Sequence, residues 1–223
     1  MQPASQLTWP VLPQGFHDSP HLFRQSLSQD LQNFNSPEVV VLQYVDDILL
    51  CAEIEEACSR ASEDFLNFLA GCGYKASREK AQLCQQSIRY LGLIISEGTR
   101  AIGPQRIKPI LNHPLPMTLR QFWGFWGITG YCSLWIPCFG ELAQPLYTLI
   151  AETQQAQIDK LVWSPDTQKA FKVLQNALLQ APTLSLPTGS EFYLFVTERK
   201  GVALGVLTQP RGPHQQPTAY LSR

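Results

Sequence analysis

Two adjacent carboxylates, Asp46 and Asp47, are the residues of this sequence with the clearest capacity for chemistry. Like charges side by side cost free energy unless water or cations compensate them. Carboxylate oxygens are also the ligands that hard cations such as Mg²⁺ prefer. The pair is therefore a candidate metal site, and its simplest alternative interpretation is a solvated acidic turn.

Two apolar runs, 39–42 and 48–50, flank this pair and must position it. Apolar runs of this length, bounded by polar residues, indicate strands. The pattern predicts a strand, a tight turn and a second strand, with both carboxylates at the tip of a hairpin. Because successive strand residues point to opposite faces, one carboxylate is expected to face a cleft and the other to lie beside or behind it.

The elements on either side of the hairpin indicate an α+β layer. A helix is predicted from Pro20 to Asn33, capped by Asp18, and an amphipathic helix from Glu53 to Ala70. Further strands are expected at 74–76 and 81–84, with a hairpin over 88–95 that turns near 97–98. This order predicts helices packed on one face of an antiparallel sheet.

The second half of the chain reads as mainly helical and then as strands. Thr118 is expected to cap a helix from Leu119 to about Leu134, whose aromatic residues favour core packing over direct ligand stacking. The other predicted elements are a helix over 139–150 bent at Pro145, a polar linker over 151–160, a helix over 165–180, and strands at 192–196, 202–207 and 218–221.

Composition is that of a globular protein, with 44% hydrophobic and 16% charged residues. No apolar run approaches a membrane span, and the first twenty residues lack a signal-peptide pattern, so an intracellular protein without membrane association is expected. The six cysteines show no C-x-x-C spacing, which favours reduced, mostly buried thiols. His17 and His21 favour a surface role over a metal pair, because Pro20 separates them and no third ligand is near.

Charge is unevenly distributed, although the net charge is only −1. Residues 38–64 hold eight acidic residues against Arg60 alone, and residues 73–108 hold seven basic residues against two acidic ones. An acidic block followed by a basic one suits a site that holds cations beside a phosphate backbone. Ordinary variation in charge along a chain could produce the same contrast.

Taken in order, several motifs resemble the reverse transcriptases of retroviruses, most closely those of gammaretrovirus-like and endogenous retroviral Pol proteins. The motifs are Leu12-Pro13-Gln14-Gly15-Phe16 with Ser19-Pro20, Tyr44-Val45-Asp46-Asp47, Gly73-Tyr74-Lys75-Ala76-Ser77 with Lys80, Tyr90-Leu91-Gly92, and Leu134-Trp135-Ile136-Pro137 with Pro145-Leu146-Tyr147. The resemblance covers nearly the whole chain. It implies a partial polymerase palm over 1–99, a mainly helical thumb over 100–155 and a partial RNase H-like connection subdomain over 156–223.

The chemistry that this resemblance implies is nucleotidyl transfer with two Mg²⁺ ions, or Mn²⁺ in their place, on an RNA or DNA template–primer with deoxynucleoside triphosphates. Asp46 would be the main metal ligand of the hairpin and Asp47 a secondary one. The remaining roles implied are contacts with template, nucleotide or primer end by Gln14, Gly15, Tyr44 and Val45, a cation near the pyrophosphate at Lys80, and a primer grip at Leu91 and Gly92.

One feature of the family is missing from the sequence. Its polymerases carry a further aspartate on the strand before the glutamine–glycine loop, but residues 1–17 contain no acidic residue. The fingers subdomain and the RNase H domain would lie in missing parts of the polyprotein. We therefore expect the isolated chain to lack polymerase activity. The alternatives are a non-catalytic remnant that binds nucleic acid or protein, and an unstable product with no role.

Overall fold

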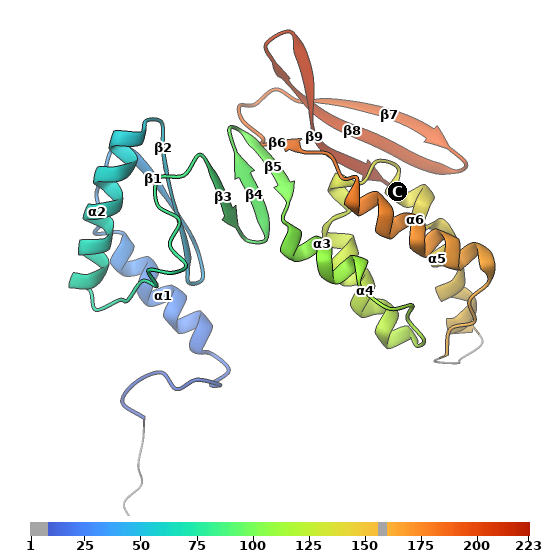
Figure 1. Ribbon diagram of the computed structural model, residues 1–223, viewed down its shortest axis with the longest axis horizontal. Helices are drawn as coiled ribbons and strands as arrows, with labels where there is room; N and C mark the ends of the chain where they lie inside the picture. The colour runs from blue at the N-terminus through green and yellow to red at the C-terminus, as the bar shows by residue number, and fades with distance from the viewer. Residues whose placement is uncertain (1–8, 156–159) are drawn as a thin grey trace, which may run out of the picture. The chain divides into compact units, whose positions relative to one another are not determined.

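The computed structural model describes residues 9–155 and 160–223 and divides the chain into two compact units, residues 1–86 and 87–223 (Figure 1). Strand β1 (Val39–Tyr44) and strand β2 (Asp47–Ala52) of the first unit form an antiparallel pair. Val41 lies opposite Leu50, and Tyr44 lies opposite Asp47. The predicted strand–turn–strand arrangement around the two carboxylates is confirmed.

Two helices, α1 (Ser19–Leu31) and α2 (Glu55–Gly71), cover one face of this hairpin. The core between them is built on Leu27, Phe65 and Leu69, against which the inward residues of both strands pack. Strand burial alternates from Val39 to Tyr44, as a hairpin with one covered face requires. The predicted α+β arrangement, with helices on one face of an antiparallel sheet, is confirmed.

The details of these helices differ from the sequence prediction. The helix predicted to begin at Glu53 begins at Glu55, and Ile54, just before it, is 57% exposed. Asp18 makes no capping hydrogen bond with its side chain, and one of its carboxylate oxygens instead lies 2.7 Å from Nδ1 of His17. Pro20 still lies in the first turn of α1, where a missing backbone N–H costs nothing.

Two strands predicted for this unit are absent. Residues 74–76 and 81–84 do not form strands, because no neighbouring strand offers them a ladder of backbone hydrogen bonds. The side chain of Tyr74 is instead held by α1, since its hydroxyl donates to Asp30 at 2.6 Å.

The cysteines are free thiols as expected, but they are not mostly buried, since Cys132 alone of the six is buried.

The second unit begins with a four-stranded antiparallel sheet. Its strands are β3 (Ser87–Tyr90), β4 (Leu93–Ser96), β5 (Thr99–Ile102) and β6 (Leu184–Ser185), in that order. The predicted hairpin over 88–95 is a meander with two turns, at 91–92 and at 97–98. The first of these turns was missed because Leu91 lies within an otherwise apolar run that reads as one strand.

The helices of the second unit surround a single hydrophobic core. They are α3 (Pro104–Leu111), α4 (Leu119–Tyr131), a short 3₁₀ helix η1 (Ser133–Trp135), α5 (Phe139–Gln155) and α6 (Pro165–Leu179). Thr118 caps α4 by accepting from the backbone N–H of Gln121 at 3.2 Å, as predicted. The predicted linker is wrong for residues 151–155, which continue α5, and its residues 156–159 lie outside the described residues.

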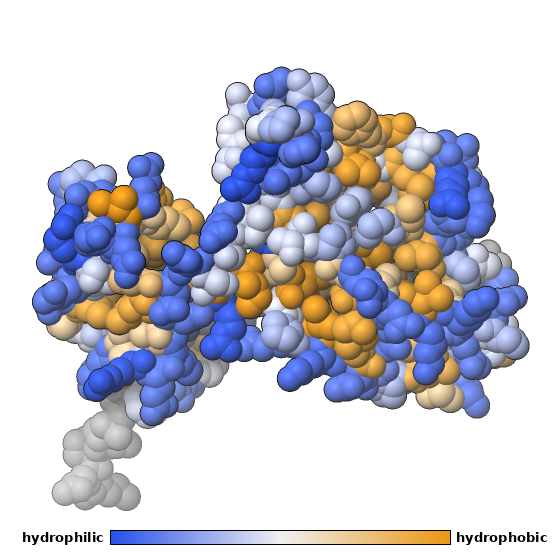
Figure 2. Space-filling view, turned by 45° about the horizontal axis from the view of Figure 1, so that its top comes forward, coloured by the Kyte–Doolittle hydropathy of each residue, from blue (hydrophilic) through white to orange (hydrophobic). Residues whose placement is uncertain are grey.

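Three strands complete the second unit: β7 (Tyr193–Arg199), β8 (Val202–Arg211) and β9 (His214–Ser222). They form an antiparallel sheet in chain order and run longer than the sequence predicted. Apolar residues interrupt the polar surface of this unit in Figure 2. Leu194 and Val196 of β7 are exposed apolar residues of this unit, with 54% and 65% of each residue accessible to solvent. Within the described residues, no helix is long and apolar enough to cross a membrane.

Candidate functional site

The turn that carries the carboxylates contains only two residues, Val45 and Asp46, between the paired Tyr44 and Asp47. Val45 has a φ of 54°, in the left-handed region that a β-branched residue rarely adopts. Such a conformation costs on the order of 1–3 kcal/mol and persists only where the surroundings hold it. The hairpin tip is therefore a strained turn, of the kind that marks functional sites.

Gln43 supplies part of what holds this turn, and sequence reasoning did not single it out. Its side-chain amide donates to the carbonyl of Val45 at 3.1 Å and to the carbonyl of Arg24, on α1, at 3.2 Å. One side chain thus links the turn to the helix beneath it. The sequence signal was available, because Gln43 is the one polar residue on the covered face of an otherwise apolar strand.

Both carboxylates are exposed. Tyr44, which is 57% exposed, lies on the uncovered face of the hairpin opposite Asp47 in the ladder. In the part of the chain that the structure describes, neither Asp46 nor Asp47 forms an ion pair with a basic residue. Their oxygens are therefore free to bind cations, which supports the interpretation of the pair as a candidate metal site.

The donor set has the right chemistry for a divalent cation but few members. Asp46 and Asp47 offer carboxylate oxygens, the ligands that Mg²⁺ and Mn²⁺ accept. Among residues 9–155 and 160–223, no group of three or more His, Cys, Asp or Glu side chains could hold a metal ion together. The two residues can thus ligate a divalent metal as part of a larger ligand set.

Gln14 and Gly15 lie in an exposed turn ahead of α1. Gly15 has a φ of 89°, and a Cβ there would meet nothing within 4 Å. The turn is tied to the start of α1, because the hydroxyl of Ser19 donates to the carbonyl of Pro13 at 3.0 Å. The Gly15 backbone can therefore be approached closely by another molecule.

Lys80 is exposed at the end of a short turn, where its backbone N–H donates to the carbonyl of Ser77 at 3.2 Å. It makes no ion pair within the described chain, and the structure does not bring it into contact with either carboxylate. Leu91 and Gly92 form the turn between β3 and β4 in the second unit, with φ values of 50° and 76°.

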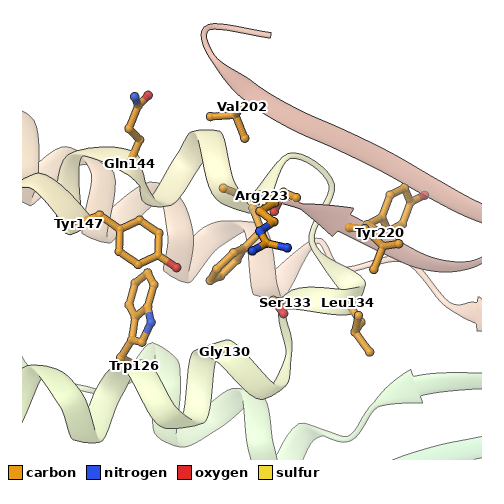
Figure 3. Close-up of a pocket in the computed structure, with 13 residues that line it drawn as sticks. Trp126, Gly130, Ser133, Leu134, Gln144, Tyr147, Val202, Tyr220 and Arg223 are labelled. Atoms are coloured by element: carbon orange, nitrogen blue, oxygen red, sulfur yellow. Dashed lines mark hydrogen bonds between the residues drawn. The ribbon is translucent and has the colours of Figure 1, made fainter. Parts of the chain in front are cut away.

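A cavity of about 560 Å³ opens in the second unit between α4, α5 and the ends of β8 and β9 (Figure 3). The rings of Trp126 and Tyr147 meet edge to face at its wall, with their centroids 4.8 Å apart. The predicted site residues are not among its lining.

Residues 2–95 match the family model described as reverse transcriptase (RNA-dependent DNA polymerase). Over 99% of its length the chain is 48% identical to the Pol polyprotein of Feline endogenous virus ECE1 and 49% identical to the Gag-Pol polyprotein of Avian reticuloendotheliosis virus. It is also 48% identical to the Gag-Pol polyprotein of Baboon endogenous virus. The chain spans 21%, 19% and 13% of the lengths of these three relatives.

Solved structures of a viral reverse transcriptase are also similar to this chain. The foamy viral protease-reverse transcriptase in complex with double-stranded DNA matches 96% of this chain, with a TM-score of 0.83 and 25% sequence identity. The same viral protein in complex with an RNA/DNA hybrid matches with a TM-score of 0.78. The match covers 37% and 28% of those two chains.

Proposed function

We propose that this chain is part of an RNA-directed DNA polymerase. Residues 2–95 carry a reverse transcriptase domain, and the whole chain is homologous to gammaretroviral and endogenous retroviral Pol polyproteins. One observation carries the proposal. A strained turn places Asp46 at the hairpin tip and Asp47 directly after it, both exposed and without basic partners in the described chain. The function proposed for this tip is to hold divalent metal for nucleotidyl transfer.

Mg²⁺ or Mn²⁺, when bound, would supply the activation of a primer 3′ hydroxyl and the stabilisation of the departing pyrophosphate. Asp46 would be the main ligand from the hairpin and Asp47 a secondary one. Tyr44 and Val45 would pack near the primer end and the nascent base pair. Strain at Val45 would keep both carboxylates in one geometry before substrate arrives, which avoids a reorganisation cost during the reaction.

The proposed partners are an RNA or DNA template–primer and deoxynucleoside triphosphates. Double-stranded DNA and an RNA/DNA hybrid occur in the complexes of the similar foamy viral protein, which supports the first of these. Gln14 and Gly15 would contact the template or nascent pair, and the exposed Lys80 would lie near the pyrophosphate. We assign residues 1–99 to a partial palm, 100–155 to a thumb and 156–223 to part of a connection subdomain.

We further propose that the polypeptide of these 223 residues, tested by itself, has negligible polymerase activity. The hairpin supplies two carboxylates, and residues 1–17 contain no acidic residue that could add a third ligand. Transition-state stabilisation by charge is usually the largest single contribution to catalysis, so an incomplete ligand set costs orders of magnitude in rate. The missing ligand would come from another part of a Pol polyprotein.

Replacing the matching segment of a gammaretroviral Pol polyprotein with residues 1–223 tests this proposal. We expect the chimera to incorporate nucleotides on a primed RNA template with Mg²⁺ and Asp46→Asn to abolish incorporation. Asp64→Asn, which removes one exposed carboxylate from α2, is the matched control and should leave the rate unchanged. Equal activity of the chimera and its Asp46→Asn variant would contradict the role of the hairpin. Robust incorporation by the 223-residue polypeptide alone would contradict its proposed inactivity.

A second candidate function is binding to nucleic acid without catalysis. The seven basic residues against two acidic ones over 73–108 favour it. Binding through phosphate contacts weakens steeply as salt rises. Salt-dependent binding of a primer–template by the chain, together with a catalytically inert chimera, would favour this second function over the first.

A further inference from the structure

Arg106 extends from α3 to the turn between β3 and β4. Its Nη2 donates a hydrogen bond to the carbonyl of Leu91 at 2.8 Å. Leu91 and Gly92 both have positive φ, so this turn contains a leucine in a conformation that costs free energy. A charge-assisted hydrogen bond to the strained residue is the kind of contact that can hold such a turn in place.

Gly92 leaves the space that the Arg106 side chain fills. A Cβ built on Gly92 would overlap Nε of Arg106 and lie 2.9 Å from its Cζ. Gly103 closes the same turn from the other direction, because its backbone N–H donates to the carbonyl of Gly92 at 3.0 Å. A Cβ on Gly103 would lie only 2.8 Å from that carbonyl oxygen. Two glycines thus allow the guanidinium and the turn to pack together.

The ring of Tyr131, the last residue of α4, fixes the guanidinium in turn. Cζ of Arg106 lies 4.0 Å from the centroid of this ring, within the range of a cation–π contact. Nε of Arg106 is buried and has no acceptor among the described residues. Arg106 also forms no ion pair with a carboxylate in the described chain, so its positive charge remains beside the turn.

We propose that Arg106, packed on the ring of Tyr131, is a positioning residue that clamps the Leu91–Gly92 turn to α3, so that the turn meets a primer strand in one geometry. The reference to a primer rests on the proposed function; the clamp itself does not. The arrangement does two things at once. It stabilises a strained backbone, and it places an unneutralised cation where a phosphate backbone would approach.

Hydrogen exchange of the 223-residue chain tests the clamp without any nucleic acid. Arg106→Gln should raise the exchange rate of the Gly103 amide and of the segment 91–93 by about tenfold, the factor that a lost charge-assisted hydrogen bond implies. Lys108→Gln removes the same charge from an exposed position on the same helix and should leave these amides unchanged. Unchanged exchange in Arg106→Gln overturns the inference, whether or not the chain binds primer.

A second readout tests the orientation of the primer. A duplex with a recessed primer carries 2-aminopurine at the primer 3′ end, and a blunt duplex of the same charge serves for comparison. Arg106→Gln should weaken binding of the recessed duplex by about tenfold and binding of the blunt duplex much less, whereas Lys108→Gln should weaken both by the same small factor. Arg106→Lys should restore the charge but not the preference for the recessed end, because lysine lacks the planar guanidinium.

The outcomes separate the two proposals. Faster exchange in Arg106→Gln with no duplex binding by the unmodified chain supports the clamp and counts against the proposed function. Equal weakening by Arg106→Gln and Lys108→Gln on both duplexes means that Arg106 acts only as one charge among several, which overturns its positioning role. A preference for the recessed end that only Arg106→Gln and Arg106→Lys lose supports both proposals.

Discussion

The side-chain amide of Gln43 donates a hydrogen bond to the carbonyl of Val45 at 3.1 Å, within the turn that carries Asp46. The same amide reaches the carbonyl of Arg24 on α1. Replacement by leucine keeps the size of the side chain but leaves both carbonyls without this donor. We expect Gln43→Leu to lower the free energy of unfolding by about 1–2 kcal/mol. Urea denaturation measures this, with Gln25→Leu on an exposed position of α1 as the neutral control.

Strain at Val45 gives a prediction of opposite sign. Asparagine tolerates the left-handed region far better than valine does, so Val45→Asn should raise the free energy of unfolding by about 1 kcal/mol. Val40→Asn, at a position of β1 that is 60% exposed, should lower it, because asparagine is a poor strand residue. If both variants destabilise the chain equally, strain at Val45 is not relieved by the substitution. Polymerase activity of the chimera should fall in Val45→Asn if the strain serves catalysis.

Gln175 on α6 donates hydrogen bonds to backbone carbonyls at and just after the carboxyl-terminal end of α3. Its buried amide nitrogen donates to the carbonyls of Ile110, Leu111 and His113 at 2.8, 3.3 and 3.2 Å. Gln175→Leu leaves buried acceptors unpaired and should cost about 1–3 kcal/mol of unfolding free energy. Gln168→Leu, on the exposed side of the same helix, should change the stability by less than about 0.5 kcal/mol. Similar losses in the two variants would show that the three carbonyls find other partners.

Helix α4 carries both buried and exposed aromatic residues, so substitutions on it can distinguish core packing from ligand stacking. Phe125 is fully buried and its ring centroid lies 4.6 Å from that of Phe171, so Phe125→Ala should cost about 3–5 kcal/mol. Trp123 is 47% exposed on the same helix, and Trp123→Ala should cost much less. Thermal and urea unfolding compare the two. A loss of duplex binding in Trp123→Ala at unchanged stability would assign ligand stacking to Trp123.

Glu141 is expected to make the stability of the second unit sensitive to acid. The hydrogen bond from Lys200 at 2.7 Å lowers the pKa of Glu141, and the charge of Arg199 acts in the same direction against a raising effect of burial. A carboxyl whose pKa is lower in the folded chain stabilises it above the unfolded pKa, and this stabilisation disappears as pH falls through the folded value. Melting temperatures measured from pH 7 to pH 3 should therefore fall less steeply in Glu141→Gln than in the unmodified chain. Parallel curves would contradict this role of Glu141.

The sequence determined the parts of the protein that depend on local patterns. Short apolar runs on both sides of Asp46 and Asp47 predicted the hairpin, and Thr118 marked the start of α4. These features follow from side-chain period and from capping chemistry, which neighbouring residues decide. The ordered motifs also identified the family, and the homologues among Pol polyproteins agree with it.

Tertiary structure decided what depends on contacts between distant segments. Residues 74–76 have no neighbouring strand to pair with, and Tyr74 instead bonds to Asp30, 44 residues away in the sequence. The contacts of Arg106 with Leu91 and Tyr131 form only in the folded chain. The hydrogen bond of Gln43 to Arg24 likewise joins a strand to a helix. No local pattern encodes such contacts, because each depends on two segments that meet only in the folded chain.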